Sequence, residues 1–301
     1  MPKHQMDSAN KPISSDGRTY HVETRPGEVA NRIVTVGDPQ RARILAQYLD
    51  KILFEHESHR GFLTITGLYK SLPVSIVAIG MGLSMMDFFV RETRMVVTGP
   101  LAIVRLGSCG SICSAKTGDL IIASSAFGIS RNHDYFLHTP AVGELPYLLS
   151  LPVDGDAGLT AELEKQMLAH RVGSTVVRGS VGNADSFYGS QGRPGTDFYD
   201  ANDGLLAAIR SHAPDVAALE MESHMLFHLA RTSTGPLNDR PASIRAACAL
   251  LVFADREGNS FITPENSARS VRLAAAAVLD SLVAAMPTQD GLHPAEASVW
   301  K

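Results

Sequence analysis

Residues Ile33-Val34-Thr35-Val36-Gly37-Asp38-Pro39-Gln40-Arg41 join a short run rich in Val and Ile to a turn that opens on glycine. A short apolar run closed by glycine is typical of a buried strand, and a helix-length pattern follows over residues 39–50. The same alternation recurs along the chain. We therefore predict a layered α/β protein whose strands are buried on both faces.

The remaining elements follow the same order. Further strands are predicted at residues 72–79, 101–106, 120–124, 174–181 and 244–253. Helices are predicted at residues 84–97, 160–170, 216–231 and 264–285, the last opened by Thr263 and Pro264. Because no repeat or linker divides the chain, we expect one domain over residues 19–287, with mobile ends at 1–18 and 288–301. Long loops are expected at residues 132–155 and 232–240.

The composition is that of an ordinary globular protein. Of 301 residues, 45% are hydrophobic and 19% are charged, and the net charge of −4 is too small for a disordered chain. No global positive field favours nucleic acid or an anionic membrane as a partner. Three cysteines are too few for a disulfide framework, and the apolar stretch 273–286 is too short for a membrane span. The N-terminal residues do not resemble a signal peptide, so we expect a cytoplasmic protein.

Three strand-to-turn junctions are candidate anion sites, at residues 37–41, 80–84 and 107–111. Glycine lets backbone N–H groups approach an anion, Ser108 adds a hydroxyl, and Arg41 and Arg105 add guanidinium groups. An arginine at the end of an apolar strand is costly to bury without an anionic partner. No nucleotide-binding P-loop motif occurs, so the predicted ligand is a single anion of phosphate size. Ordinary tight turns are the competing interpretation.

Two further segments carry polar side chains suited to a ligand. Glu220 and Glu222 flank Met221 within apolar sequence, where a carboxylate is costly unless it holds hydroxyl groups or a cation. In the second segment, Phe187 offers a stacking face, and Gln191 and Arg193 offer donors and an acceptor that suit an imide-like base edge. A solvated helix face and an ordinary polar loop are the alternatives.

Metal and serine-hydrolase chemistry are less favoured. His224 and His228 share a helical face, but two histidines without an H-E-x-x-H motif do not complete a zinc site. No G-x-S-x-G motif is present, so a nucleophilic serine is not indicated. We expect no metal and no cofactor.

In this order, these segments resemble the nucleoside phosphorylase-I superfamily, and most closely its uridine phosphorylases, from about His21 to the C-terminal helix. The resemblance implies a single-domain three-layer fold with a central mixed, twisted β-sheet flanked by helices. The phosphate-binding positions that it implies are Gly37, Arg41, Arg60, Arg105 and Ser108, with Arg60 reaching the site of a neighbouring subunit.

The same resemblance assigns the nucleoside site. Phe187-Tyr188-x-x-Gln191-x-Arg193 matches the F-Y-x-x-Q-x-R motif of uridine phosphorylases, and Glu220-Met221-Glu222 matches the E-M-E ribose motif. The implied nucleoside-binding residues are His21 from the adjacent subunit, Phe187, Gln191, Arg193, Glu220, Met221, Glu222, Asp255 and Arg256. The implied catalytic residues are Arg193, Gln191 and Glu222, in a homodimer that shares its active sites.

Three departures from the family pattern bear on substrate and assembly. Asp255 is an aspartate of the purine-specific type, whereas the adjacent Arg256 is of the uridine type. The carboxylate and serine that hold a monovalent cation in bacterial relatives fall at Gly61 and Met85. The segments 132–155 and 232–240 are insertions.

The implied reaction is phosphorolysis of uridine, and also of deoxyuridine or thymidine, to uracil and a pentose 1-phosphate, a step of pyrimidine salvage. Purine nucleoside phosphorylase is the nearest alternative. A hydrolytic nucleosidase, a non-catalytic nucleoside-binding protein and a metal-dependent hydrolase are the others. The sequence leaves the base, the oligomer beyond a dimer and the cation site open.

Overall fold

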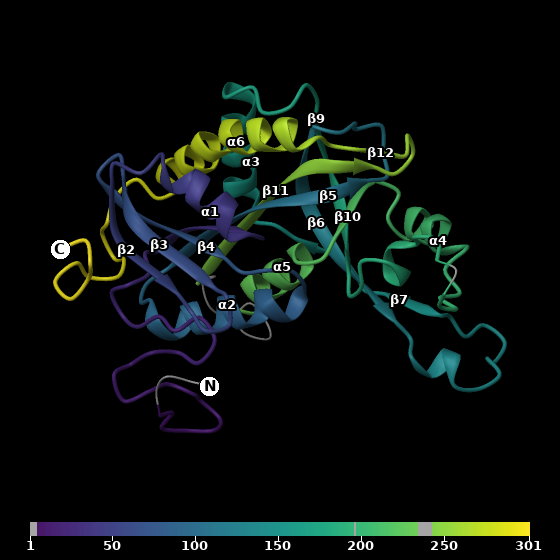
Figure 1. Cartoon of the computed structure of the whole chain (residues 1–301), viewed down its shortest axis with the longest axis horizontal. Coiled ribbons are helices and arrows are strands. Elements are labelled where there is room, and N and C mark those ends of the chain that lie inside the picture. The colour runs from purple at the N-terminus through teal and green to yellow at the C-terminus, as the bar shows by residue number, and fades with distance from the viewer. Residues whose placement is uncertain (1–4, 196, 234–242) are drawn as a thin grey trace.

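A mixed β-sheet forms the centre of the molecule and helices cover both of its faces (Figure 1). The computed structural model describes residues 5–195, 197–233 and 243–301. The strands among them are β1 Arg32–Val36, β2 Lys51–Glu57, β3 Leu63–Tyr69, β4 Leu72–Ala78, β5 Leu101–Ser111, β6 Leu120–Arg131, β7 Tyr147–Leu149, β8 Val153–Asp154, β9 Val176–Ala184, β10 Val216–Glu220, β11 Ile244–Asp255 and β12 Ser260–Phe261. The α-helices are α1 Pro39–Ala46, α2 Leu83–Val96, α3 Ala157–Ala169, α4 Leu205–His212, α5 Ser223–Thr232 and α6 Pro264–Ala285.

Five of the strands close into a ring. Strand β5 pairs with β11, β11 with β6, β6 with β9, β9 with β10, and β10 again with β5. The sheet continues from β5 through β1 and β4 in parallel, and then through the antiparallel strands β3 and β2. The mixed strand directions and the flanking helices confirm the predicted three-layer fold class.

The two faces of the sheet have separate apolar cores. Helices α1, α3 and α6 cover one face and helices α2 and α5 cover the other (Figure 1). The first core includes Leu45, Leu163 and Val278, and the second includes Phe89 and Phe227, all fully buried. Side chains on both faces of strands such as β5 and β11 are therefore excluded from water, which explains their nearly continuous apolar sequences.

One predicted helix is wrong in its first part. Residues 216–231 were expected to be helical throughout, but Val216–Glu220 form β10 and the helix α5 begins only at Ser223. All five residues of β10 are buried, and a short apolar run of this kind does not distinguish a buried strand from a buried helix. The hairpin β2–β3 at residues 51–69 was not predicted, because the edge strand β2 carries charged residues on an otherwise apolar pattern.

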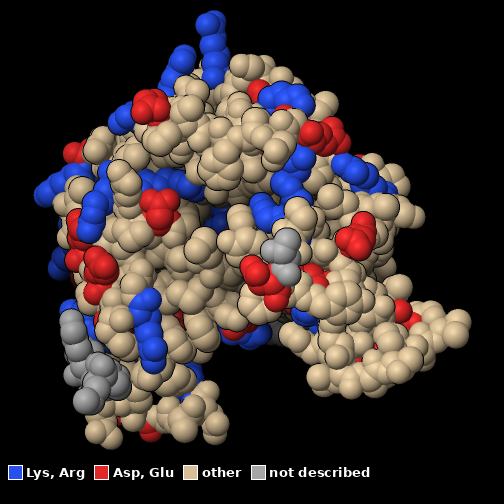
Figure 2. Space-filling view, turned by 45° about the vertical axis from the view of Figure 1, so that its right-hand side comes forward, with Lys and Arg blue, Asp and Glu red and all other residues tan. Residues whose placement is uncertain are grey.

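The segment expected to be a long loop at 132–155 forms a protruding lobe. It contains the 3-10 helix η1 (Asp134–Phe136) and the short strands β7 and β8, both of which pair with β6. Leu137, Val142 and Leu145 are exposed on it, and Figure 2 shows the lobe at lower right with few charged side chains. Most of the other expected loop, at 232–240, lies outside the described residues.

The C-terminal segment packs against the start of the sheet. The buried Arg32 side chain donates to the carbonyls of Met286 and Thr288, and the N–H of Val299 donates to the carbonyl of Gly27 at 3.0 Å. His293 is 6% exposed. The mobility expected for residues 1–18 and 288–301, and the domain bounds 19–287, stay predictions.

Candidate active site

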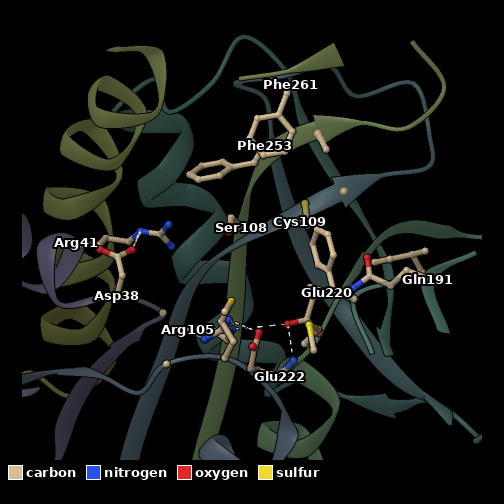
Figure 3. Close-up of a pocket in the computed structure, with 18 of the residues that line it drawn as sticks. Asp38, Arg41, Arg105, Ser108, Cys109, Gln191, Glu220, Glu222, Phe253 and Phe261 are labelled. Atoms are coloured by element: carbon tan, nitrogen blue, oxygen red, sulfur yellow. Dashed lines mark hydrogen bonds and ion pairs between the residues drawn. The ribbon is translucent and has the colours of Figure 1, made fainter. Parts of the chain in front are cut away.

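A cavity of about 400 Å³ lies at one end of the strand ring, where β5, β10 and β11 end and the turn after β1 begins (Figure 3). Ten residues predicted from the sequence line it: Gly37, Arg41, Arg105, Ser108, Phe187, Gln191, Arg193, Glu220, Met221 and Glu222. The structure thus brings together four stretches that are separated by up to 185 positions between Gly37 and Glu222.

The turn 37–41 forms one wall of the cavity. Asp38 has extended backbone and caps α1, because its carboxylate accepts the N–H of Arg41 at 2.8 Å, and Pro39 occupies the first turn. The Arg41 side chain is nearly buried and reaches the middle of β5, where it donates to the carbonyl of Leu106 at 3.3 Å. Burial lowers the pKa of Arg41, and Asp38 opposes that effect. This arrangement holds a cation beside the Gly37 backbone.

Arg105 is the buried cation at the floor of the cavity. It lies on β5 between Thr35 of β1 and Cys248 of β11, and it is 3% exposed. Its Nη2 group donates to Glu222, and its Nε lies 3.7 Å from a carboxylate oxygen of Glu220 (Figure 3). Burial disfavours its charge, but the two carboxylates outweigh burial and raise the pKa of Arg105.

Two donor groups of Arg105, Nε and Nη1, are buried without a hydrogen-bond partner. Buried donors of this strength are nearly always paired in folded proteins, so each unpaired group costs about 1–3 kcal/mol. Nε has only the longer ion pair with Glu220 at 3.7 Å. The hydroxyl-bearing Ser108 lies further along the same strand and lines the same cavity.

The two glutamates of the E-M-E segment have different partners. Glu220 ends β10 and accepts the backbone N–H groups of Glu222 and Ser223 at 2.9 and 3.0 Å, so it caps the start of α5. Glu222 accepts the N–H of Gly82 at 2.6 Å in addition to the Arg105 donor. Burial and the charge of Glu222 raise the pKa of Glu220, against the opposing effect of Arg105. Glu222 is therefore the carboxylate directed across the cavity floor, and Glu220 the one that supports it.

The opposite wall carries the polar groups predicted for a base. The guanidinium of Arg193 lies 3.7 Å from the ring centre of Phe187 and donates to the side-chain oxygen of Gln191 at 2.6 Å. Gln191 lies in the short 3-10 helix η2 (Gly189–Gln191), and its side chain points into the cavity in Figure 3. Burial and the charge of Arg256 lower the pKa of Arg193 to about 10, so it remains a cation at neutral pH. The ring, the amide and the guanidinium form one recognition surface.

Asp255 and Arg256 are not among the described residues that line the cavity, and their contact with the nucleoside stays a prediction. The carboxylate of Asp255 accepts the N–H of Gly258 at 2.8 Å and pairs with Lys116 at 3.0 Å. These two donors hold the pKa of Asp255 below its ordinary value of 3.8. Arg256 donates to the carbonyls of Gln191 and Gly192, so it supports the loop at residues 187–193 from outside the cavity. Strand β11 ends at Asp255, and the carboxylate accepts from the loop that follows.

His21 and Arg60 also lie outside the cavity of their own chain. His21 is oriented by Glu92 at 2.6 Å and stacks on Phe88, while Arg60 lies 6.0 Å from the ring centre of Tyr20. The two predicted residues therefore lie near one aromatic residue, since the rings of Tyr20 and His21 are 4.8 Å apart. Their contribution to a neighbouring subunit stays a prediction.

Some cavity residues were missed from the sequence. Met81, Phe253 and Phe261 line the cavity, and Met81 and Phe261 are 78% and 70% exposed at its rim. Phe261 lies in the two-residue strand β12, which no hydrophobic period could reveal. A large exposed apolar side chain at the rim of a cavity is the signal that finds Met81 and Phe261, and it needs the structure.

Within the described ranges, no group of three or more His, Cys, Asp or Glu residues is arranged to hold a metal ion. His224 and His228 have ring centres 6.1 Å apart, and burial lowers the pKa of His224. Among the same residues, no helix has the length and apolar character needed to cross a bilayer.

The sequence profile of the phosphorylase superfamily matches residues 31–284. A uridine phosphorylase of Thermococcus kodakarensis is 30% identical over 257 residues, covering 84% of this chain and 83% of the relative. A DeoD-type purine nucleoside phosphorylase of Lactococcus lactis is 27% identical over 216 residues, 70% of this chain and 79% of the relative. A solved structure from work on two uridine phosphorylases of the oomycete Phytophthora capsici has a TM-score of 0.85 and 36% identity, covering 93% of this chain and 98% of that one.

The chain belongs to the phosphorylase superfamily. This confirms the resemblance found in the turn, ribose and base motifs. Within that family it is an enzyme, a pentosyltransferase of the nucleoside phosphorylase kind.

Proposed function

We propose that this enzyme cleaves uridine with inorganic phosphate and releases uracil and ribose 1-phosphate. One observation carries the proposal: a single cavity has Arg41 and Arg105 at one side and Gln191 at the other (Figure 3). Phe187 and Arg193 line the same cavity and are in contact with each other, and Arg193 donates to Gln191. The first pair suits an oxyanion, and the second group suits a flat ring with an imide edge. The uridine phosphorylases among the similar proteins support the same substrate.

The anion side of the cavity positions the nucleophile. A phosphate oxygen attacks C1′ of the nucleoside, the bond from C1′ to the base nitrogen breaks, and its electron pair leaves with the base. Arg105, Arg41 and Ser108, which line this side of the cavity, hold the phosphate beside C1′. The rate enhancement comes from orientation of the phosphate and from electrostatic stabilisation. One such donor contributes about 3 kcal/mol to stabilisation of the transition state, a factor of roughly a hundred in rate.

The base side stabilises the leaving group. Uracil departs as an anion, and Arg193 and Gln191 offer donors to its oxygen-bearing edge, so no strong general acid is needed. Glu222 is placed to accept hydroxyl groups of the ribose above Met221. Asp255, the residue of purine-specific type, is held anionic by Lys116 and the Gly258 N–H, which does not suit protonation of a purine. These contacts favour a pyrimidine over the purine alternative.

We also propose the oligomeric state of the enzyme, the pathway and compartment in which it acts, and its further substrates. The enzyme acts as a homodimer in pyrimidine salvage in the cytoplasm, with His21 and Arg60 of each subunit reaching the site of the other. Phosphate is a co-substrate, and no cofactor or metal takes part. Deoxyuridine and thymidine are further substrates, because neither alters the edge that Gln191 and Arg193 read.

A substrate comparison tests the proposal. Base release is measured at saturating phosphate with uridine, deoxyuridine, thymidine and inosine, in parallel and at equal enzyme concentration. We expect the highest kcat/KM with uridine and at least a hundredfold lower value with inosine. A higher value with inosine would overturn the pyrimidine assignment and leave the phosphorylase class intact.

A further inference from the structure

Two side chains from elsewhere in the chain, Arg256 and Asn202, donate to backbone carbonyls of the base loop, residues 187–193. Arg256 donates to the carbonyls of Gln191 at 3.0 Å and Gly192 at 3.2 Å. Asn202 donates from Nδ2 to the carbonyls of Gly189 at 3.1 Å and Arg193 at 3.0 Å. Asn202 is not part of the F-Y-x-x-Q-x-R motif, and it does not line the cavity.

The two carbonyls bound by Asn202 are the ends of a tight turn. The N–H of Arg193 returns to the carbonyl of Tyr188 at 3.1 Å, and Gly192 has φ +63, a left-handed conformation that favours glycine. One amide nitrogen bridging both ends fixes the separation between the start of η2 and the Arg193 backbone. The side chains of Gln191 and Arg193 project from inside this bridged turn.

Asn202 is itself anchored to the body of the protein. Its carbonyl accepts the N–H of Leu205, the first residue of α4, and Leu205 is packed in an apolar cluster with Phe127 and Ile129 of β6. A side chain at Gly192 would meet Leu206 of the same helix at 3.1 Å. The loop therefore rests on the start of α4, and Asn202 is the polar connection between them.

We propose that Asn202 is a positioning residue for base recognition, which sets the register of Gln191 and Arg193 by bridging the carbonyls of Gly189 and Arg193. The inference rests on the proposed phosphorolysis, since it assigns those two side chains to the base. Loss of the bridge lets the turn open and moves both donors away from the edge that they read. A displacement of about 1 Å of such groups is enough to cost a large factor in rate. Asn202 makes no contact with the phosphate side of the cavity, so loss of its side chain leaves the affinity of the enzyme for phosphate unchanged.

The variants Asn202→Asp and Asn202→Ala separate hydrogen bonding from packing. Aspartate keeps the shape of asparagine but turns an acceptor toward two carbonyls, and alanine removes the donor. Asn202→Ser retains one donor, so its kcat/KM for uridine should lie between those of wild type and Asn202→Ala. The series therefore stays informative if one variant folds poorly. The matched control is Asn132→Asp, because Asn132 is a half-buried asparagine that donates to a single carbonyl, that of Leu145 at 3.0 Å, in the lobe.

The experiment measures the kinetics of each variant with the nucleoside and phosphate varied in turn. For Asn202→Asp and Asn202→Ala we expect kcat/KM for uridine to fall at least tenfold, with the KM for phosphate within twofold of wild type, and no change in the control. A smaller fall in either variant, or a parallel rise in the phosphate KM, would overturn the inference. If wild type prefers inosine, the proposed substrate fails, and the same comparison with inosine tests Asn202 separately. A wild type that cleaves no nucleoside would overturn both.

Discussion

Replacement of Arg193 by alanine separates recognition of the base from folding. The side chain is half-buried, it lies over Phe187, and it donates to Gln191 and to the Phe187 carbonyl, both at 2.6 Å. Its loss from the fold removes a cation–π contact and two hydrogen bonds, one to an exposed backbone carbonyl and one to the buried Gln191 side chain, about 1 kcal/mol in all. In the proposed reaction, its loss removes a charged donor to the departing uracil anion, about 3 kcal/mol of transition-state stabilisation. Activity is therefore expected to fall far more than stability.

The assay compares kcat/KM for uridine with the midpoint of thermal unfolding. For Arg193→Ala we expect kcat/KM to fall roughly a hundredfold, while the midpoint falls by about 2–4 °C. Arg178→Ala is the control, since Arg178 lies on the strand β9 that precedes the loop and pairs with Glu164 at 3.3 Å on the surface. Retention of more than a third of wild-type kcat/KM by Arg193→Ala would refute the assignment of Arg193 to the base. An equal loss in the control would show that the effect is not local.

Three further substitutions test other parts of the structure. Glu222→Ala leaves the buried Arg105 without its closest partner, so chemical denaturation should show a loss of about 3–5 kcal/mol in the free energy of unfolding, and a loss below 1 kcal/mol would contradict the buried pair. Asp255→Asn should keep kcat/KM for uridine within threefold, whereas a hundredfold loss in the same assay would return this residue to the chemistry. Burial raises the pKa of Asp280, but hydrogen bonds from lysine, tyrosine and histidine outweigh burial and hold that pKa below 3.8. Its carboxylate therefore stabilises the fold above pH 3.8, and that contribution is lost as the pH falls toward the lowered pKa. Asp280→Asn should cost about 1 kcal/mol at pH 7 and much less at pH 3 in urea unfolding, and an equal cost at both would contradict this sign.

Much of the fold followed from the sequence because buried strands have a strong local signal. The runs at β1, β4, β5 and β11 are apolar on both faces, and each was predicted within a few residues of its start. The errors lie where the local signal is ambiguous. The five buried residues of β10 read equally well as part of a helix, and the charged strand β2 gave no strand signal at the edge of the sheet.

The candidate site was predictable where a chemical group and a turn coincide. Arg41 follows the end of β1, and the sequence placed Arg105 at a strand end, where a buried cation needs an anion; this pattern alone indicated an oxyanion site. The predicted turn at residues 107–111 is wrong, because β5 continues to Ser111 and Arg105 lies in its middle. The residues proposed to read the base, Gln191 and Arg193, needed the family motif, because in a polar loop they have no distinctive local signal. Phe261 and Asn202 could not be found from sequence, since their roles depend on contacts between segments that the strand ring brings together.

Arg105 and Arg41 beside the base loop imply that phosphate, not water, attacks the nucleoside, and the sugar product reports this directly. Uridine is incubated with the enzyme in the presence and absence of inorganic phosphate, and the pentose product is followed by phosphorus NMR. We expect ribose 1-phosphate in an amount equal to the uracil released, and negligible uracil release when phosphate is omitted. Free ribose formed at the same rate in both incubations would contradict it and identify a hydrolase.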